Sequence, residues 1–448
     1  MIRQAQTTFF LFIILFLTLP ACGPATSHYV RVDQALARGD YEKADGIVEK
    51  SKGGYGSRSD LIYLLDRGMT LQLAGRYAES NRYFDGAERK IDELFATSIS
   101  EEVSSFALND NTVSYEGEDF ERVMINIFSA LNYVELGELD DALVEARKVD
   151  YKLTLLNDRH EKKNVYKSDA LAQYLSGILY ESRGETNDAY ISYVKAFSAF
   201  KDYQRDYKTP IPPFIGSDLI RTADAMAFSE EKEGYLKRFP EVPWESEKSL
   251  SQKAEVVLVV YAGRSPVKVD RIVTIPIPDG AGGVYPVRIA FPQFVAQPSQ
   301  TRGAEIRSDQ AEGPAVRAYL VEDVTAIAVK NLDDRIARIS AKAIARATAK
   351  AVAALKIRQE AAKSGSVAKE LLANISTSLY SIGTERADKR SWRTLPGEVF
   401  LGRMVLEPGT HHLKVRYLTG PGGLIEEREF EVTVKSGEKK FLIDRVMN

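Results

Sequence analysis

A glycine-centred pattern recurs four times in the first half of the chain and restricts how that half can fold. Each copy starts with a glycine, has a small residue five positions later and a larger or apolar residue nine positions later. The four glycines are Gly39, Gly75, Gly137 and Gly184. Glycine ends a helix readily because it adopts the left-handed backbone conformation at little cost. The pattern therefore predicts helical hairpins with a tight turn at each glycine.

A second small residue precedes three of these glycines by seven positions: Gly68, Ala130 and Gly177. Together the two patterns resemble tetratricopeptide repeats, in which small residues let the two helices of a hairpin approach closely and stacked hairpins bury one another's faces. The glycines are 36, 62 and 47 residues apart, so the array is irregular. A plain α-helical bundle with coincident turns is the alternative.

The repeat domain is expected to cover 28–245. Its extra length falls mainly in 97–122, which is polar and is interpreted as an insertion at a loop. After the proline-rich stretch 210–213, a further helix is predicted from Ser217, as its N-cap, to about Arg238. Such a helix would close the open end of the stack.

The concave wall of a tetratricopeptide array is formed by the first helix of each hairpin. In this chain those positions are largely apolar: Leu65, Met69, Ile127, Leu131, Tyr174 and Ile178. If this wall were exposed to water, it would form an apolar patch. Large apolar patches on a protein surface normally mark a binding site for a partner. Two interpretations stay open. Another segment of this chain fills the groove, or an apolar helix or extended peptide of a partner binds there.

The second half, 253–448, changes to β-branched runs separated by glycine and proline turns, which predicts a β-rich, sandwich-like domain. The predicted strands cover 256–261, 267–273, 284–291, 398–406, 411–418, 425–434 and 440–446, with one or two more in 315–329 and a loop or edge excursion in 292–314. The overall fold class is therefore multidomain α + β, with an N-terminal α-helical solenoid and a C-terminal β-rich domain.

A helical insertion at about 332–382 interrupts these strands. Its first helix, Leu332 to about Lys363, has apolar residues at spacings of three and four and a basic opposite side. The apolar stripe is mostly alanine, which favours close packing on protein over insertion into lipid. Contact of the basic side with lipid head groups or an acidic partner is the alternative. A second helix is predicted at about 366–382.

The first 21 residues contain an apolar run, 9–19, which is too short to span a bilayer. The run is followed by Cys22, the only cysteine in the chain. This segment resembles a bacterial lipoprotein signal peptide. The resemblance implies cleavage after 21, acylation of Cys22, a tether over 22–27, and a membrane-anchored protein. An ordinary secretory signal is the alternative. In such lipoproteins an aspartate directly after the cysteine favours retention at the inner membrane. This chain has Gly23 at that position, so we expect the protein at the periplasmic face of the outer membrane.

The sequence contains no motif for catalysis, a cofactor or a metal site. Its four histidines lack metal-ligand spacing, and no phosphate-binding loop or serine elbow is present. His411 and His412 are adjacent on a predicted strand, so one is expected to face solvent. The net charge of −3 argues against nucleic-acid binding. We therefore predict no catalytic residues, no cofactor and no nucleic-acid partner.

Taken with this order of segments, the stretches 130–133, 144–147, 169–170, 174–177 and 391–396 resemble an uncharacterised family of bacterial lipoproteins with tetratricopeptide-like repeats and a β-rich C-terminal domain. The resemblance implies a role in envelope assembly, near lipoproteins of secretion channels or of penicillin-binding-protein activation. We expect an interaction scaffold that binds one or more envelope proteins. An enzyme or ligand-binding protein acting on cell-wall material is the alternative.

Overall fold

The computed structural model describes residues 27–107, 113–159, 165–278, 284–309, 315–363, 387–420 and 422–448. Cys22 and the predicted signal peptide lie outside these ranges. The elements run in chain order as α2 (Ser27–Ala37), α3 (Tyr41–Lys50), α4 (Lys52–Tyr55), η1 (Ser57–Ser59), α5 (Asp60–Leu73), α6 (Tyr77–Ala107), α7 (Asp119–Leu136), α8 (Leu139–Arg159), α9 (Ala170–Ser182), α10 (Thr186–Asp206), α11 (Phe214–Ala225), α12 (Ser229–Arg238), α13 (Glu247–Leu250), β1 (Ala254–Ala262), β2 (Val267–Pro278), β3 (Val284–Val295), β4 (Gly303–Ser308), β5 (Val316–Glu322), α14 (Val324–Lys363), β6 (Glu398–Leu406), β7 (Gly409–Gly420), β8 (Gly423–Val434) and β9 (Lys439–Val446).

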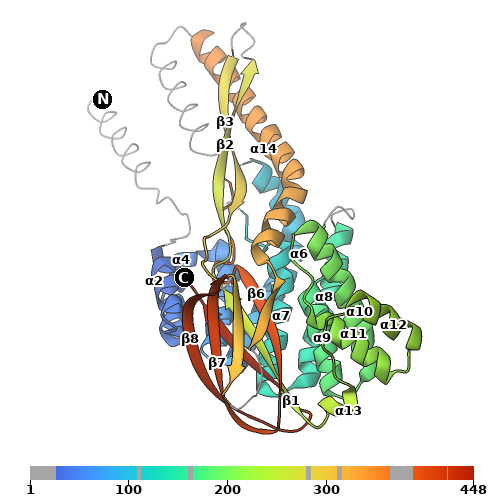
Figure 1. Cartoon of the computed structure of the whole chain (residues 1–448). Helices are drawn as coiled ribbons and strands as arrows, with labels where there is room; N and C mark the ends of the chain where they lie inside the picture. Colours follow the sequence, from blue (N-terminus) through green and yellow to red (C-terminus); the bar gives the residue numbers. More distant parts are fainter. Residues whose placement is uncertain are drawn as a thin grey trace.

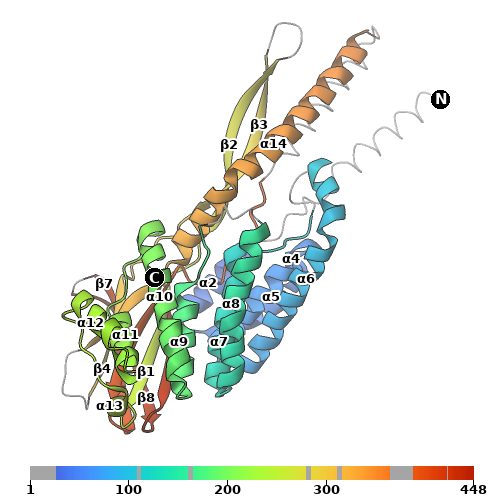
Figure 2. The ribbon, with the colours of Figure 1, turned by 90° about the vertical axis from the view of Figure 1, so that its right-hand side faces the viewer.

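The helical half is built from hairpins that turn at the predicted glycines (Figure 2). Gly39, Gly75, Gly137 and Gly184 have φ values of 70°, 73°, 77° and 73°. After each glycine, the next backbone N–H donates to the carbonyl five residues earlier, at 2.8–3.0 Å. This bond pairs a helix-terminal carbonyl that would otherwise be left without a donor. The predicted hairpin turns, and with them a tetratricopeptide-like helical region, are confirmed.

A further hairpin, α11–α12, closes the array and differs from the single helix predicted from Ser217 to Arg238. It turns at Ala227, which has φ 56° and the same bond pattern, because Phe228 N–H donates to the Ala223 carbonyl at 2.9 Å. A non-glycine residue in this conformation is uncommon. With no glycine at the turn, the local sequence does not mark the break.

Helix α6 continues into the segment interpreted as a loop insertion, and α7 begins before that segment ends. Helix α6 ends at Ala107, and α7 begins at Asp119. The stretch 87–116 is polar but contains no glycine or proline. Polarity alone does not end a helix, because a helix that leaves the core can be polar on every side. Within the described part of the insertion, only 113–118 has no helix or strand, and 108–112 lies outside the described residues.

The small residues of the repeat pattern mark places where two helices touch. A Cβ atom built on Gly68 would lie 2.3 Å from the ring of Phe84, and one built on Gly177 would lie 2.4 Å from the ring of Tyr193. Both distances are far below van der Waals contact. The aromatic ring of the second helix therefore occupies the space above the glycine, as the tetratricopeptide-like pattern implies.

The β-rich half forms one curled sheet and a separate ribbon, not the predicted sandwich. The sheet has the strand order β8-β7-β4-β5-β6-β1-β9, and the ribbon pairs β2 with β3. Only the β1–β9 pair is parallel in the described ladders. The two edge strands are linked by side chains, since Arg428 on β8 donates to Asp444 on β9 at 2.8 Å. Alternating strands are equally compatible with a sandwich and a curled sheet, which is why the sequence did not distinguish them.

Strand β1 is buried on both faces and joins two hydrophobic cores. Val256, Leu258 and Val260 belong to the core inside the curled sheet. Val257 and Val259 belong to the core that the sheet shares with the helical array. The helical and β-rich halves therefore share one continuous apolar interface.

Two further elements differ from the sequence-based expectation. Strand β4 lies inside 292–314, and α14 begins at Val324, eight residues before the predicted start. The start is capped by Asp323, whose carboxylate accepts a hydrogen bond from Ala326 N–H at 2.8 Å. A side-chain acceptor at this position satisfies a backbone donor of the first turn. The second predicted helix, 366–382, lies outside the described residues.

The ribbon and α14 together project from the body, and we call them the arm (Figures 1 and 2). Helix α14 has 40 residues, which corresponds to about 60 Å. Its alanine ridge lies on strand β3. The buried residues of this small core are Val287, Ile289, Phe291, Ala343, Ala347 and Ala351.

The glycine–aromatic contact predicts a stability change that depends on position. Gly68→Ala should lower the free energy of unfolding by about 1–3 kcal/mol, because the new methyl group overlaps the Phe84 ring. Gly46→Ala is the control, since Gly46 lies within α3 and has open space around its Cβ position. The control should gain up to about 1 kcal/mol of helix propensity. Urea unfolding measures both, and equal changes would contradict the packing argument.

Candidate functional site

The six predicted groove residues are buried beneath the chain's own sheet. Leu65, Met69, Ile127, Leu131, Tyr174 and Ile178 are each at most 2% exposed. They share one apolar core with the outward-facing residues of β1, with Leu401 on β6 and with Phe441 on β9. Of the two interpretations left open by the sequence, the structure has the one in which another segment of the chain fills the groove. In this conformation the six side chains offer no surface to a partner.

A buried network of three cations and three carboxylates links the helical array to the sheet. Arg403 on β6 donates to Asp218 at 2.7 Å and to Glu255 at 2.7 Å. Arg221 on α11 lies 2.6 Å from Glu181 and 2.8 Å from Asp218. The network is completed by Lys439 on β9, 3.3 Å from Glu181. The formal charges balance, so each buried ion has partners of opposite sign.

The electrostatics of Glu181 follow from this arrangement. Burial raises the pKa of its carboxyl group, but the charges of Arg221, Lys439 and Arg403 outweigh burial and hold the pKa well below its usual range. Glu181 therefore stays charged at neutral pH. The network supports structure and orientation, and none of its members was singled out from the sequence.

A second ionic cluster, which we call the arm socket, holds the base of the arm. Glu118 caps the N-terminus of α7 and accepts hydrogen bonds from Lys268 on β2 and Arg335 on α14. Burial would raise the pKa of Glu118, but the two cations lower it to about 2. One carboxylate thus joins the helical array, the ribbon and the long helix. No local signal predicts this contact, because Glu118 and Arg335 are 217 positions apart.

Glu121 lies one turn further along α7 and accepts three hydrogen bonds. Its donors are Trp392 N–H at 2.6 Å, the Tyr115 hydroxyl at 2.6 Å and Glu118 N–H at 2.9 Å. Burial, followed by the nearby Glu118 charge, raises the pKa of Glu121 to about 7. The two adjacent carboxyl groups thus have opposite pKa shifts, because only Glu118 is directly paired with cations.

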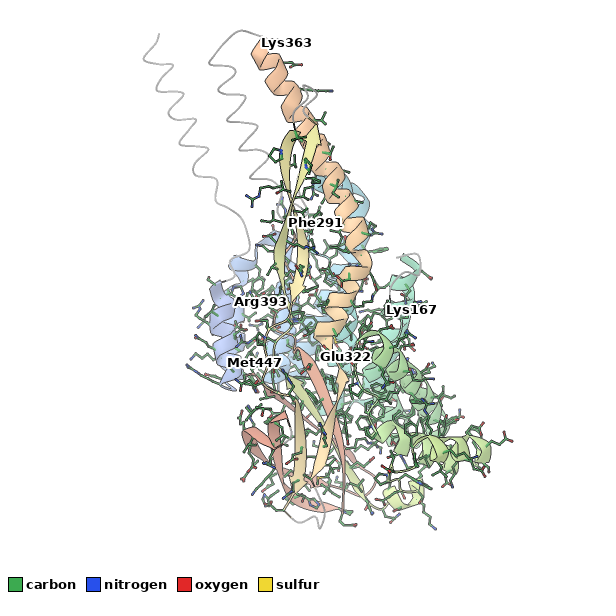
Figure 3. The ribbon with its side chains drawn as sticks, turned by 45° about the horizontal axis from the view of Figure 1, so that its top comes forward. Lys167, Phe291, Glu322, Lys363, Arg393 and Met447 are labelled. Carbon is green, nitrogen blue, oxygen red and sulfur yellow. The ribbon has the colours of Figure 1, made fainter. Side chains whose placement is uncertain are left out.

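The arm exposes apolar side chains beyond its socket. Figure 3 places Phe291 on the ribbon and Lys363 near the far end of α14. Ile272, Val273 and Val284 on the ribbon are 53%, 40% and 67% exposed. Farther along α14, Ile344 and Val352 are 40% and 42% exposed. Part of the basic side predicted for α14 is not solvated, because Arg335 enters the socket and Arg346 is buried.

Three further expectations concern a metal site, the two adjacent histidines and a membrane-spanning helix. Among the described residues, no group of histidine, cysteine or acidic side chains is arranged to hold a metal ion. His411 is buried, with Nε2 2.7 Å from the Glu407 carbonyl, and His412 is exposed. Within the described ranges, no helix combines the length and apolarity needed to cross a bilayer.

No protein-family model matches the chain, and no curated protein matches it. Solved structures with partial likeness include a putative kinesin light chain from Podosopora anserina with tetratricopeptide-like repeats, at 13% identity and a TM-score of 0.32, covering 48% of this chain and 93% of that one. BtubC from P. vanneervenii has 14% identity and a TM-score of 0.33, over 48% and 78%. MamA from Desulfovibrio magneticus RS-1 has 15% identity and a TM-score of 0.31, over 50% and 97%. Likeness at this level supports no inference, so the repeat assignment rests on the turns and helix contacts described above.

The buried network predicts a large cost for removing Arg403. Arg403→Met should lower the free energy of unfolding by about 3–5 kcal/mol, because Asp218 and Glu255 would remain buried without that partner. The matched control is Arg416→Met, which removes a strand arginine that is 37% exposed and paired with Glu305. An exposed pair of this kind contributes about 0–1 kcal/mol. Similar losses in both variants, measured by urea unfolding, would contradict a special role for the network.

The raised pKa of Glu121 predicts a stability that falls as pH rises. The folded protein holds this proton up to about pH 7, whereas the unfolded chain releases it near the ordinary value of 4.5. Stability is therefore highest below pH 4.5 for this group and is lost as pH rises through 7. Asp66 and Asp169, each with a pKa raised to about 6 by burial, act in the same direction.

Glu121→Gln should reduce the slope of unfolding free energy against pH between 5 and 7, because glutamine does not titrate. Urea unfolding at several pH values measures this slope without depending on the absolute stability of the variant. The depressed pKa of Glu118 keeps that group charged throughout the same window, so it leaves the slope unaffected. Identical slopes in the wild type and the variant would contradict the assignment.

Proposed function

We propose that this protein is a lipid-anchored scaffold of the bacterial cell envelope that presents its arm to an envelope protein. Acylation of Cys22 holds the chain at the periplasmic face of the outer membrane. The helical array and the curled sheet form the base, and the ribbon with α14 is the contact element. The partner is a protein involved in envelope assembly or secretion.

The observation that carries this proposal is the arm itself. It projects from the body and exposes large apolar side chains on both the ribbon and the helix. By contrast, the concave wall of the array, where the sequence placed the partner site, is filled by the sheet. Exposed apolar residues on a projecting element favour contact with another protein.

The arm socket supports the same function because it fixes the arm in one position relative to the body. Lys268 and Arg335 both bind the buried Glu118 carboxylate, so the two parts of the arm meet the array at one point. Above the socket, the alanine ridge of α14 lies close against β3. A partner bound on the arm would thus be held at a defined place relative to the base.

Site-specific photocrosslinking in intact cells tests the proposal. A photoreactive residue at Ile272 or Val352 on the arm should capture one envelope protein. The same residue at Tyr151 is the control, because Tyr151 is 66% exposed but lies on α8 in the body. Leu131 serves as a second control within the filled groove. Capture at Tyr151 or Leu131, with none on the arm, would contradict the assignment of the contact element.

The anchor is tested in the same cells. Wild-type protein should remain in the membrane fraction and carry acyl groups on its first residue by mass spectrometry. Cys22→Ser should release the protein from the detergent phase, because the acyl chains provide the stable attachment. A free thiol at the processed terminus of the wild type would refute the lipid anchor.

A further inference from the structure

Helix α2 is the first described element after Cys22. It starts at Ser27, so at most about 17 Å of extended chain separates it from the cysteine. If Cys22 is acylated as proposed above, α2 lies next to the membrane. Its buried face packs on the protein through Tyr29, Val32 and Leu36. The opposite face is free to meet the bilayer surface.

That opposite face has an uncharged centre. Val30, Gln34 and Ala37 are exposed and lie along one side of the helix, at spacings of three and four residues. Val30 is 61% exposed. A helix of this kind suits the interface between head groups and acyl chains, where its exposed apolar residues meet lipid.

Arginines flank this uncharged strip on both sides. On one side, Arg31 and Arg38 of α2 are exposed and lie two turns apart. On the other side, Arg264 reaches α2 and its Nη1 lies 3.9 Å from Asp33 Oδ2. On the same side, the guanidinium of Arg393, which is labelled in Figure 3, lies 4.4 Å from the centre of the Tyr29 ring.

The cations on the Asp33 side outnumber the nearby carboxylate. Burial raises the pKa of Asp33, and the charges of Arg264, Arg393 and Arg445 oppose that rise. Arg445 is 1% exposed, and its side chain donates to the carbonyl oxygens of Thr394, Gly263 and Leu395. It therefore adds positive charge beneath the surface. The adjacent Arg428 is already matched by Asp444 and Glu426.

We propose that this face of α2, flanked by Arg31 and Arg38 on one side and by Arg264 and Arg393 on the other, lies on the membrane and binds the phosphate groups of anionic phospholipids. The protein as a whole has a formal charge of −3, so the basic face is a local feature and not a consequence of overall charge. The contact would orient the body relative to the bilayer, which an acyl anchor at one residue alone does not do.

Vesicle co-sedimentation tests this contact without the acyl anchor. The mature chain carrying Cys22→Ser is mixed with vesicles of phosphatidylcholine alone, or of phosphatidylcholine and phosphatidylglycerol. It should bind the anionic vesicles and not the neutral ones, and added salt should weaken binding. Because this chain has no acyl group, failure here leaves the lipid anchor unaffected. Conversely, a missing acyl group in the wild type leaves this measurement unaffected.

Paired variants locate the contact. Arg31→Gln with Arg38→Gln, and separately Arg264→Gln with Arg393→Gln, should each reduce binding roughly tenfold or more, because each basic residue near an anionic surface contributes about fivefold. Arg264→Lys with Arg393→Lys keeps the charge and should retain binding. The matched control, Arg82→Gln with Arg205→Gln, removes two exposed arginines elsewhere in the array and should have little effect.

Three results would overturn the proposal. They are equal binding to neutral and anionic vesicles, an equal loss in the control pair, and stronger displacement of the protein by inorganic phosphate than by sodium chloride at the same ionic strength, which would indicate a site for a free anion. Since Arg393 packs on Tyr29, its variant is also checked for an unchanged unfolding midpoint. The exposed Arg31 and Arg38 pair keeps the test decisive if the other pair is destabilised.

Discussion

The packing of one strand into the concave side of the helical array supports the rest of the structure. Strand β1 places Val257, Val259 and Tyr261 against the array and its alternate residues inside the curled sheet. Each large apolar side chain buried in this way contributes about 1.5–3 kcal/mol. Separated from the sheet, the array would expose its apolar wall, and the sheet would expose one face of β1. The two halves are therefore best understood as one folding unit with a shared core.

Buried charges then define how the halves are aligned along that apolar interface. Apolar contacts are non-directional, whereas the Arg403 network and the arm socket require particular pairs at hydrogen-bond distance. Arg403 reaches Glu255 on the neighbouring strand and Asp218 on α11, and Glu118 reaches both parts of the arm. Buried ion pairs add little net stability but can select one arrangement over others. In this protein they orient the sheet on the array and the arm on the body.

Much of the secondary structure was predictable because its signals are local. The turn glycines, the small residues that precede them and seven strand positions were each read from a few neighbouring residues. The elements that were predicted wrongly also have local causes. Ala227 turns a hairpin without a glycine, the polar end of α6 has no helix breaker, and β4 lies in a stretch with proline and glycine that resembled a loop.

The site was less predictable than the fold. The apolar wall formed by Leu131, Ile178 and their neighbours was correctly located on the first helices of the hairpins, yet the sequence left open what covers it. The covering residues come from strands that begin more than seventy positions further along the chain. The socket was not anticipated either, since Glu118 is an ordinary acid in a polar stretch until Lys268 and Arg335 are brought to it.

The sequence by itself determined the helical hairpins and most strands, because each depends on residues that are close together in the chain. Only the tertiary structure decided that the groove is filled, that the sheet curls into a single layer and that ribbon and helix form an arm. These outcomes depend on contacts between distant segments, and neither periodicity nor turn chemistry carries information about which distant surface a given face will meet.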